Sequence, residues 1–120
     1  PEAVNNRCVK SHEYIFLFAK SKKYYFNADA IRIRDVRRGS VWTFNTASLS
    51  EAHFAVFPED LPALCIKAGT KKGDTVLDPF MGSGTTAQIA QKLGRKWVGI
   101  ELNPKYIEII KRRTAQEELF

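Results

Sequence analysis

Residues 75–103 constrain the fold of this chain more than any other stretch, because a glycine turn joins two apolar runs there. The first run is β-favouring and predicts a short buried strand. Asp78 and Pro79 end that strand, since proline cannot donate a hydrogen bond to a strand ladder. Gly82 and Gly84 then permit a tight turn at which a ligand can approach the backbone closely.

The rest of the stretch predicts a helix and a second strand. Residues 85–93 carry aliphatic side chains at helical spacing, and Gly94 is a natural stop for a helix. Residues 97–100 form another apolar run, which ends at Glu101. A turn of this kind presents backbone N–H groups, and a carboxylate after the next strand can accept hydrogen bonds from ribose hydroxyls. Glu101 follows Gly84 by 17 residues, close to the spacing of about 20 in nucleoside-binding βαβ units.

The glycine pattern itself narrows the ligand. The turn reads DPFMGSGTT, which is neither G-x-G-x-x-G nor a phosphate-binding loop, because no lysine follows the glycines. A nicotinamide-dependent enzyme is therefore disfavoured, and 120 residues leave no room for its substrate domain.

Three blocks in order resemble one family. DPFMGSGTT followed by GIELNPKYIEIIKRR is similar to the S-adenosylmethionine-binding region of the DNA methyltransferases that methylate the exocyclic nitrogen of adenine or cytosine. HFAVFPEDL, at residues 53–61, resembles the family's motif at the methionine end of the cofactor. SHEYIFLFAKSKKYYFN, at residues 11–27, resembles the preceding segment in the subgroup whose catalytic motif comes first and cofactor motif last.

The resemblance implies an α/β fold: a partial Rossmann-like three-layer sandwich lacking the strands that carry the catalytic motif. One domain is expected over residues 1–120, with a strand and basic segment at 1–50 and a cofactor-binding β-α-β-α unit at 51–120. It also implies a prokaryotic restriction-modification enzyme that acts on DNA in the cytoplasm and uses S-adenosylmethionine. Matching motif positions assign cofactor contacts to Phe54, Ala55, Asp78, Pro79, Phe80, Gly82, Ser83, Gly84, Thr85, Thr86, Glu101, Leu102 and Asn103.

Roles follow from the same match. The glycine turn would surround the methionine end of the cofactor, Asp78 would orient that turn, and Glu101 would take the ribose hydroxyls. Leu102 and Asn103 would lie near the adenine. Simple helix capping by the turn's hydroxyl side chains is the competing interpretation, and it is compatible with ligand binding because both use one helix N-terminus.

The family's catalytic tetrapeptide, Asp/Asn/Ser-Pro-Pro-Tyr/Phe, is absent from this sequence. In the family it holds the flipped base, which must leave the duplex before its amine can be methylated. The chain is therefore expected to be inactive alone: a C-terminal fragment, one half of a split enzyme, or a remnant that binds cofactor or a partner without catalysis. Exposed sheet edges left by missing strands would favour self-association. The sequence does not distinguish adenine from cytosine as the target.

The net charge of +6 fits an anionic partner such as DNA. Residues 1–40 hold nine lysines and arginines against four acidic residues. Phosphate contact and a solvated or salt-bridged surface remain alternative explanations for the candidate nucleic-acid residues Lys20, Lys22, Lys23, Arg32, Arg34, Arg37 and Arg38.

Other segments carry simpler expectations. Residues 13–19 are the most hydrophobic run and predict a buried strand, and residues 59–68 predict a helix with Leu61, Leu64, Cys65 and Ala68 on one face. Asn103 and Pro104 predict a helix start, Ile107 and Ile110 its core face, and the basic residues 111–113 a complement to its dipole. No metal site, membrane helix or signal peptide is expected, and the two cysteines are expected to be free thiols.

Overall fold

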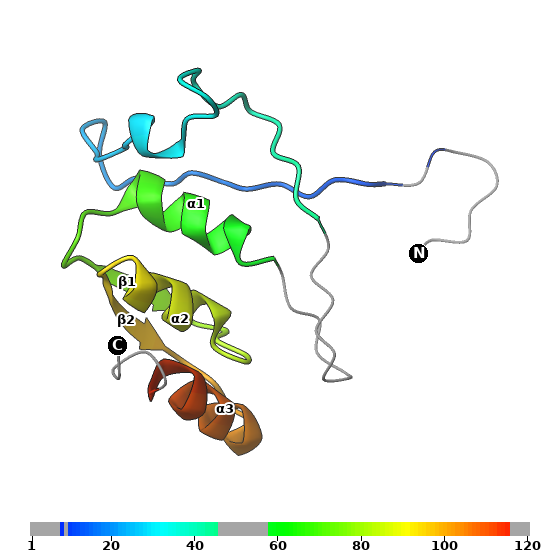
Figure 1. Cartoon of the computed structure of the whole chain (residues 1–120), viewed down its shortest axis with the longest axis vertical. Coiled ribbons are helices and arrows are strands. Elements are labelled where there is room, and N and C mark those ends of the chain that lie inside the picture. Colours follow the sequence, from blue (N-terminus) through cyan, green and yellow to red (C-terminus); the bar gives the residue numbers. More distant parts are fainter. Residues whose placement is uncertain (1–7, 9, 46–57, 116–120) are drawn as a thin grey trace.

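The computed structural model describes residue 8, residues 10–45 and residues 58–115. Its elements follow the chain from a short 3-10 turn to a long C-terminal helix (Figure 1). In order they are η1 (Asp29–Ile31), α1 (Asp60–Gly69), β1 (Thr75–Asp78), α2 (Thr85–Lys92), β2 (Lys96–Gly99) and α3 (Pro104–Ala115).

The predicted strand–turn–helix–strand unit is confirmed. β1 and β2 pair in parallel, with Thr75 opposite Lys96 and Asp78 opposite Gly99. α2 connects them, and Gly94 ends the connection in the left-handed conformation at φ +72°, as expected of a glycine stop. Because the strands are parallel, the residues that follow each of them meet at one edge of the sheet.

The helices bury one face of the two strands. Ile66 of α1 packs with Ile89 and Ala90 of α2, against Val76 of β1 and Trp97 of β2. The helix predicted at 59–68 is confirmed within a residue at each end, and its predicted face is confirmed only in part. Ala68 is buried as expected, whereas Leu61, Leu64 and Cys65 are half-buried and Ile66, outside the predicted face, is buried. This follows from packing, because α1 lies against α2, which determines the face that becomes buried.

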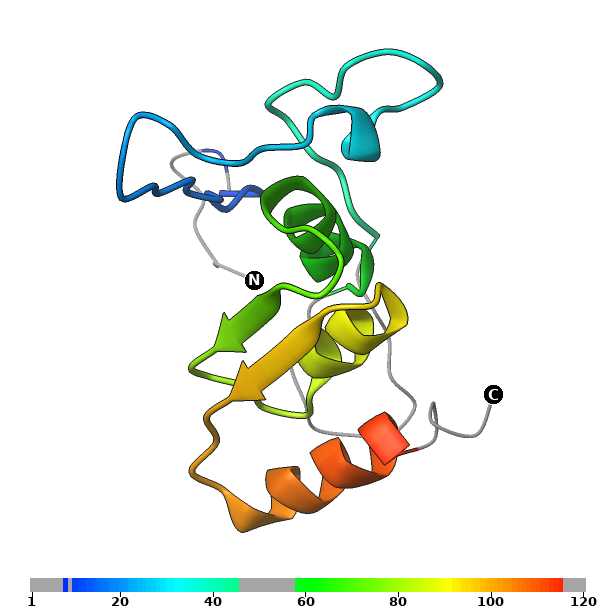
Figure 2. The same ribbon diagram turned by 90° about the vertical axis from the view of Figure 1, so that its left-hand side faces the viewer.

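The other face of the strands is exposed. Figure 2 shows α2 on one side of the two arrows and no described helix on the other. Leu77 is 62% exposed, and Val98 of β2 and Ile100 just after β2 are exposed as well. The prediction of a buried first strand is therefore wrong for this face. Parallel sheets are usually covered on both faces, and no element within the described residues supplies the second cover.

Residues 13–19 do not form the predicted buried strand. They are extended but lie outside every strand, and Phe16 is 70% exposed. Tyr14, Phe16 and Phe18 stack along one side of the segment, with ring centroids 6.0 and 5.9 Å apart. The backbone of this hydrophobic run is extended, but no neighbouring strand among the described residues completes a ladder.

The C-terminal helix begins as predicted. Asn103 Oδ1 accepts a hydrogen bond from Lys105 N–H at 3.0 Å, which caps α3 before Pro104. Ile110 is buried with Met81 and Ala87. Ile107 is exposed, so its predicted core position is wrong; α3 contacts α2 along a narrower stripe than the sequence suggested.

Three further expectations concern the cysteines, membrane helices and metal sites. Cys8 and Cys65 are both free thiols. No described helix is long and apolar enough to cross a membrane. No group of three potential metal ligands occurs within the part of the chain that the structure describes.

Candidate functional site

The glycine turn, residues 80–84, crosses the carboxyl ends of both strands. Met81 N–H donates to Ile100 O at 3.0 Å, and Ile100 N–H donates to Asp78 O at 3.0 Å. Asp78 also orients the turn through its side chain, since Oδ1 accepts from Phe80 N–H at 2.9 Å. The turn is thus fastened to the ends of β1 and β2 rather than projecting as a free loop.

Glu101 joins the turn to the residues after β2. Its Oε2 accepts a hydrogen bond from Gly82 N–H at 2.8 Å, across 19 residues of sequence. Its Oε1 accepts from Asn103 N–H at 2.8 Å. A carboxylate offers about four acceptor sites, so each oxygen can still accept a bond from a ligand hydroxyl. The structure therefore brings Asp78, Gly82 and Glu101 together, as the sequence predicted.

Two glycines are required by geometry. Gly82 and Gly84 have φ of +54° and +87°, which other residues rarely adopt. At Gly84 a Cβ would also lie 2.9 Å from Ile110 Cγ1. At Gly99, which ends β2, a Cβ would meet the side chain of Met81. The turn therefore packs so closely against α3 and the end of β2 that no side chain fits at Gly84 or Gly99 unless its neighbours shift.

The hydroxyl side chains around the turn do not cap α2. No side chain caps its N-terminus, so the capping interpretation for Ser83, Thr85 and Thr86 is wrong. Ser83 Oγ and Thr85 Oγ1 instead accept hydrogen bonds from Arg113 of α3, at 3.0 and 3.4 Å. The first N–H groups of a helix have no partner within the helix, and here they lie at the same edge as Glu101.

Arg113 is the residue that sequence reasoning missed. The sequence suggested only a favourable charge near the end of α3. A usable signal was its position three residues after Ile110, which places both side chains on one face of the helix. Because Ile110 faces the core, a long side chain on that face reaches the neighbouring element.

Thr86 is buried, and the remaining predicted residues are exposed or lie outside the described residues. Phe80 is 87% and Leu102 93% exposed, and both flank the turn and the end of β2. Pro79 and Asn103 are also exposed. Phe54 and Ala55 fall outside the described residues. In the described chain the candidate site is therefore an open edge rather than a closed cavity.

A hollow of about 610 Å³ lies elsewhere, around the residues that precede the two strands. Its lining includes Asn27, Lys67, Lys72 and Arg95, and none of the candidate site residues. It is thus distinct from the edge that carries Glu101.

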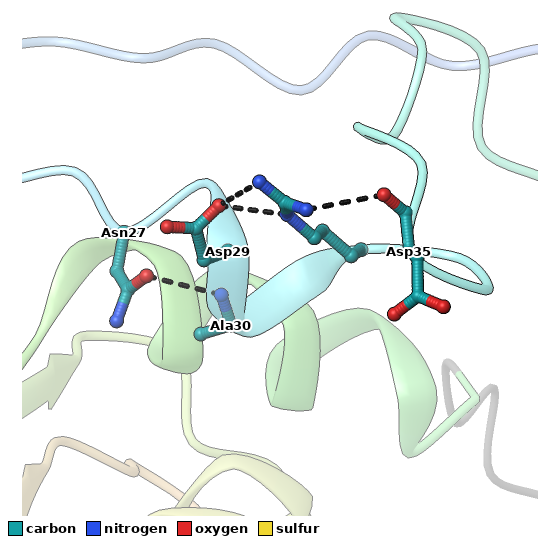
Figure 3. A network of polar contacts seen from close by, with 5 residues as sticks. Asn27, Asp29, Ala30 and Asp35 are labelled. Atoms are coloured by element: carbon teal, nitrogen blue, oxygen red, sulfur yellow. Dashed lines mark hydrogen bonds and ion pairs between the residues drawn. The ribbon is translucent and has the colours of Figure 1, made fainter.

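The candidate nucleic-acid residues fall into two groups. Arg32 is held within its own segment: its guanidinium contacts Asp29 Oδ1 at 2.7 Å and donates to Asp35 O at 3.1 Å (Figure 3). Arg38 donates to Ile31 O at 3.0 Å, with its guanidinium 5.7 Å from the Trp42 ring. Arg32 and Arg38 therefore both have partners within the chain. The remaining candidates are exposed: Lys20, Lys22, Lys23, Arg34 and Arg37.

The short segment that carries them is shaped by a tight turn. Arg34 and Asp35 both have positive φ, and Ile33 and Val36 pair across them as an isolated antiparallel bridge. Asn27 Oδ1 accepts from Ala30 N–H at 3.0 Å, and Asn27 N–H donates to Ala68 O at 2.8 Å. The segment is thus attached to the C-terminal end of α1.

Known proteins match most of this chain. Residues 1–112 match the family model described as DNA methylase, whose members are N6/N4 methyltransferases. The type II methyltransferase M.Cfr9I of Citrobacter freundii is 46% identical over 123 residues, covering 98% of this chain and 41% of that protein. M.SmaI of Serratia marcescens is 46% identical over 120 residues, covering 94% of this chain and 41% of that protein. The chain therefore spans about two fifths of the length of these relatives.

Solved structures agree with the sequence comparisons. The complex of M1.HpyAVI with SAM superposes with a TM-score of 0.63 at 30% identity, over 78% of this chain and 44% of that one. The cytosine-N4-specific PvuII DNA methyltransferase gives a TM-score of 0.62 at 27% identity, over 74% of this chain and 35% of that one. The fold is a partial Rossmann-like methyltransferase fold, and the chain belongs to the N6/N4 family of DNA methyltransferases.

Proposed function

We propose that this chain holds the S-adenosylmethionine site of a DNA methyltransferase that modifies the exocyclic amine of adenine or cytosine. The observation that carries the proposal is the hydrogen bond between Gly82 N–H and Glu101 Oε2. It places the glycine turn and the acidic residue after β2 at one edge of the sheet. Ligands of open α/β sheets bind outside the carboxyl ends of the strands, where this edge lies.

The residues at this edge fit the chemistry of S-adenosylmethionine. The N-terminus of α2 is not capped by a side chain, and its N–H groups suit the carboxylate of the methionine part. Each oxygen of Glu101 accepts one backbone amide and retains a lone pair for a ribose hydroxyl. Leu102 offers an exposed apolar surface for the adenine ring, and Phe80 one for the methionine end. When bound, the cofactor supplies a sulfonium methyl group for transfer to an amine.

In this proposal the chain binds and orients but does not hold the base. Asp78 fixes the turn through Phe80 N–H, and Glu101 fixes it through Gly82 N–H. In this proposal the cofactor-binding unit is residues 51–120, and residues 1–50 are the basic segment of the same domain. Phe54 and Ala55 would close the pocket, on the strength of the motif match. The catalytic tetrapeptide is supplied by a segment outside these 120 residues, on the same or another polypeptide.

Calorimetric titration of S-adenosylmethionine into the full chain tests the cofactor site. Glu101→Ala is expected to weaken binding by about 1–3 kcal/mol, because charge-assisted hydrogen bonds to the ligand and to Gly82 are lost. Glu108→Ala is the matched control, since this glutamate is exposed on α3 and contacts only Lys111 among the described residues. Glu101→Gln should fall between the two, since it keeps one carbonyl acceptor. Equal affinity in Glu101→Ala and Glu108→Ala would remove Glu101 from the site.

DNA is the proposed substrate, and the exposed cations of residues 20–37 are its proposed contacts. Replacing Lys20, Lys22, Lys23, Arg34 and Arg37 by glutamine should weaken DNA binding and lower its salt dependence. Arg32→Gln is the control, because that side chain is held by Asp29. An unchanged salt dependence would assign these cations to a solvated surface.

A second candidate is a module that binds cofactor or a partner without methylating. The absent tetrapeptide favours it for this chain alone. The two candidates separate in a methyl-transfer assay with the part of the Citrobacter freundii relative that this chain does not match. The exposed face formed by Leu77, Val98 and Ile100 is the proposed contact surface for such a part. Methyl transfer that occurs only when both parts are mixed supports the split-enzyme hypothesis. If the two parts associate but no methyl group is transferred, the hypothesis of a non-catalytic binding module is supported.

Self-association of the chain is tested separately by sedimentation. A folded chain that remains monomeric at high concentration would argue against self-association.

A further inference from the structure

The glycine turn is held from three directions. The residues after β2 hold it, because Met81 N–H donates to Ile100 O and Gly82 N–H donates to Glu101 Oε2. The side chain of Ile110 lies directly against Gly84, so α3 packs against the turn. The third attachment is Arg113 of α3, which lies 30 residues away from the turn in sequence.

Arg113 contacts the turn and the first residues of α2 with a single guanidinium group. Its Nη1 lies 2.9 Å from Ser83 O, 3.0 Å from Ser83 Oγ and 3.4 Å from Thr85 Oγ1. Its Nη2 donates to Gln88 Oε1 at 2.7 Å. The side chain is half-buried, and Thr85 is buried, so these bonds are shielded from water more than those of a surface pair.

We propose that Arg113 is a positioning residue for the cofactor-binding turn. By holding Ser83 O and Gln88, it fixes the direction of the turn relative to the first N–H groups of α2. If these N–H groups already point at the ligand before it binds, no free energy is spent on rearranging them, and the affinity is higher. The inference rests on the proposed function, but the rigidity of the turn can be measured without any ligand.

The planar fork of arginine is needed for this arrangement. Two nitrogens point in parallel at acceptors on separate elements, one in the turn and one a turn further along α2. A lysine ammonium can reach only one of these positions at a time. Arg113→Lys should therefore restore part of what Arg113→Ala loses, and this partial rescue distinguishes hydrogen bonding from charge alone.

The chain offers a matched control for a purely structural role. Gln91 Nε2 donates to Thr114 O at 3.1 Å and links the same two helices without touching the turn. Gln91→Ala and Arg113→Ala both remove hydrogen bonds between α2 and α3. Only Arg113→Ala also removes the hydrogen bonds that hold the turn.

The first arm of the experiment is amide hydrogen exchange in the ligand-free chain. Gly84 N–H donates to Met81 O at 3.0 Å and reports on the turn. Its exchange should speed up by about tenfold in Arg113→Ala, by less in Arg113→Lys, and should stay unchanged in Gln91→Ala. Equal exchange at Gly84 in Arg113→Ala and Gln91→Ala would overturn the proposal. Should Arg113→Ala not fold, Arg113→Lys against Gln91→Ala decides in the same way.

The second arm is titration with two ligands. Arg113→Ala should raise the Kd for S-adenosylmethionine about tenfold, and should leave the Kd for 5′-methylthioadenosine close to that of the unmodified chain. The second ligand lacks the carboxylate and amine that the turn would hold. An equal loss for both ligands, or an equal loss in Gln91→Ala, would reduce Arg113 to a structural tie. Failure of the unmodified chain to bind either ligand would contradict the proposed cofactor site, while the exchange arm would still decide whether Arg113 holds the turn.

Discussion

Two regions of this chain have a similar content of apolar residues but differ in how many of these side chains are buried. Residues 58–115 bury part of their aliphatic side chains in two small clusters between α1, α2, α3 and one face of the strands. Residues 10–45 leave most of theirs exposed, and Ile31 is their one buried side chain among the described residues. The difference lies in partners rather than in hydrophobicity. A strand or helix is buried only where the same chain supplies the surface that covers it.

The same contrast exists within the two-stranded sheet. Val76 and Trp97 face the helices, while Leu77 and Val98 face away from them and are exposed. Since side chains alternate along a strand, one face meets its partner and the other does not. The exposed face of the sheet and the exposed segment at residues 13–19 thus have one feature in common: no described element of the chain covers their apolar side chains.

The largest expected effect tests whether the two regions differ in stability. Ile66→Ala should lower the free energy of unfolding by about 3 kcal/mol, because it leaves a cavity in the cluster between α1 and α2. Phe16→Ala removes a larger side chain from the exposed region and should change it by less than about 0.5 kcal/mol. Urea denaturation of both variants provides the measurement. A loss for Phe16→Ala comparable to that of Ile66→Ala would show that residues 13–19 are buried in solution.

A smaller effect is expected from glycines in the two regions. Gly84→Ala should cost about 2 kcal/mol, since φ is +87° and the new methyl group would contact Ile110. Gly39→Ala is the control, because nothing lies within 4 Å of its Cβ position and its φ is unexceptional. Thermal unfolding of the two variants compares them directly. Similar midpoints would mean that the turn can rearrange without cost.

Local patterns predicted the elements of residues 58–115 well. The order strand, turn, helix, strand, the glycine stop at Gly94 and the cap at Asn103 depend on neighbours within a few residues, and these are confirmed. The approach of Glu101 to Gly82 was also predictable, because parallel strands bring their carboxyl ends to one edge. The assignment of cofactor contacts to these residues remains a prediction.

Contacts between distant elements could not be predicted in the same way. Arg113 was assigned to the helix dipole because nothing near it in sequence shows that Ser83 and Gln88 lie opposite. Ile107 was assigned to the core because an isolated helical pattern does not show how wide the contact with α2 is. A hydrophobic run predicts burial of residues 13–19, but it does not show which surfaces are available to cover them.

The two cysteines give the smallest and most local test of the contrast, because Cys65 lies in the covered region and Cys8 lies just ahead of the exposed one. Cys8 is exposed, whereas Cys65 lies half-buried on α1, where burial raises the pKa of its thiol. Only the thiolate reacts with iodoacetamide, so at pH 7.5 Cys65 has a smaller reactive fraction than an ordinary thiol and is also partly shielded. Labelling followed by mass spectrometry should show slower modification of Cys65. Its rate should still climb with pH above the ordinary thiol pKa of about 8.5, because the raised pKa moves the ionisation upward. Equal rates for the two cysteines at pH 7.5 would mean that α1 opens readily, and would remove the distinction between the covered and uncovered parts of the chain at that helix.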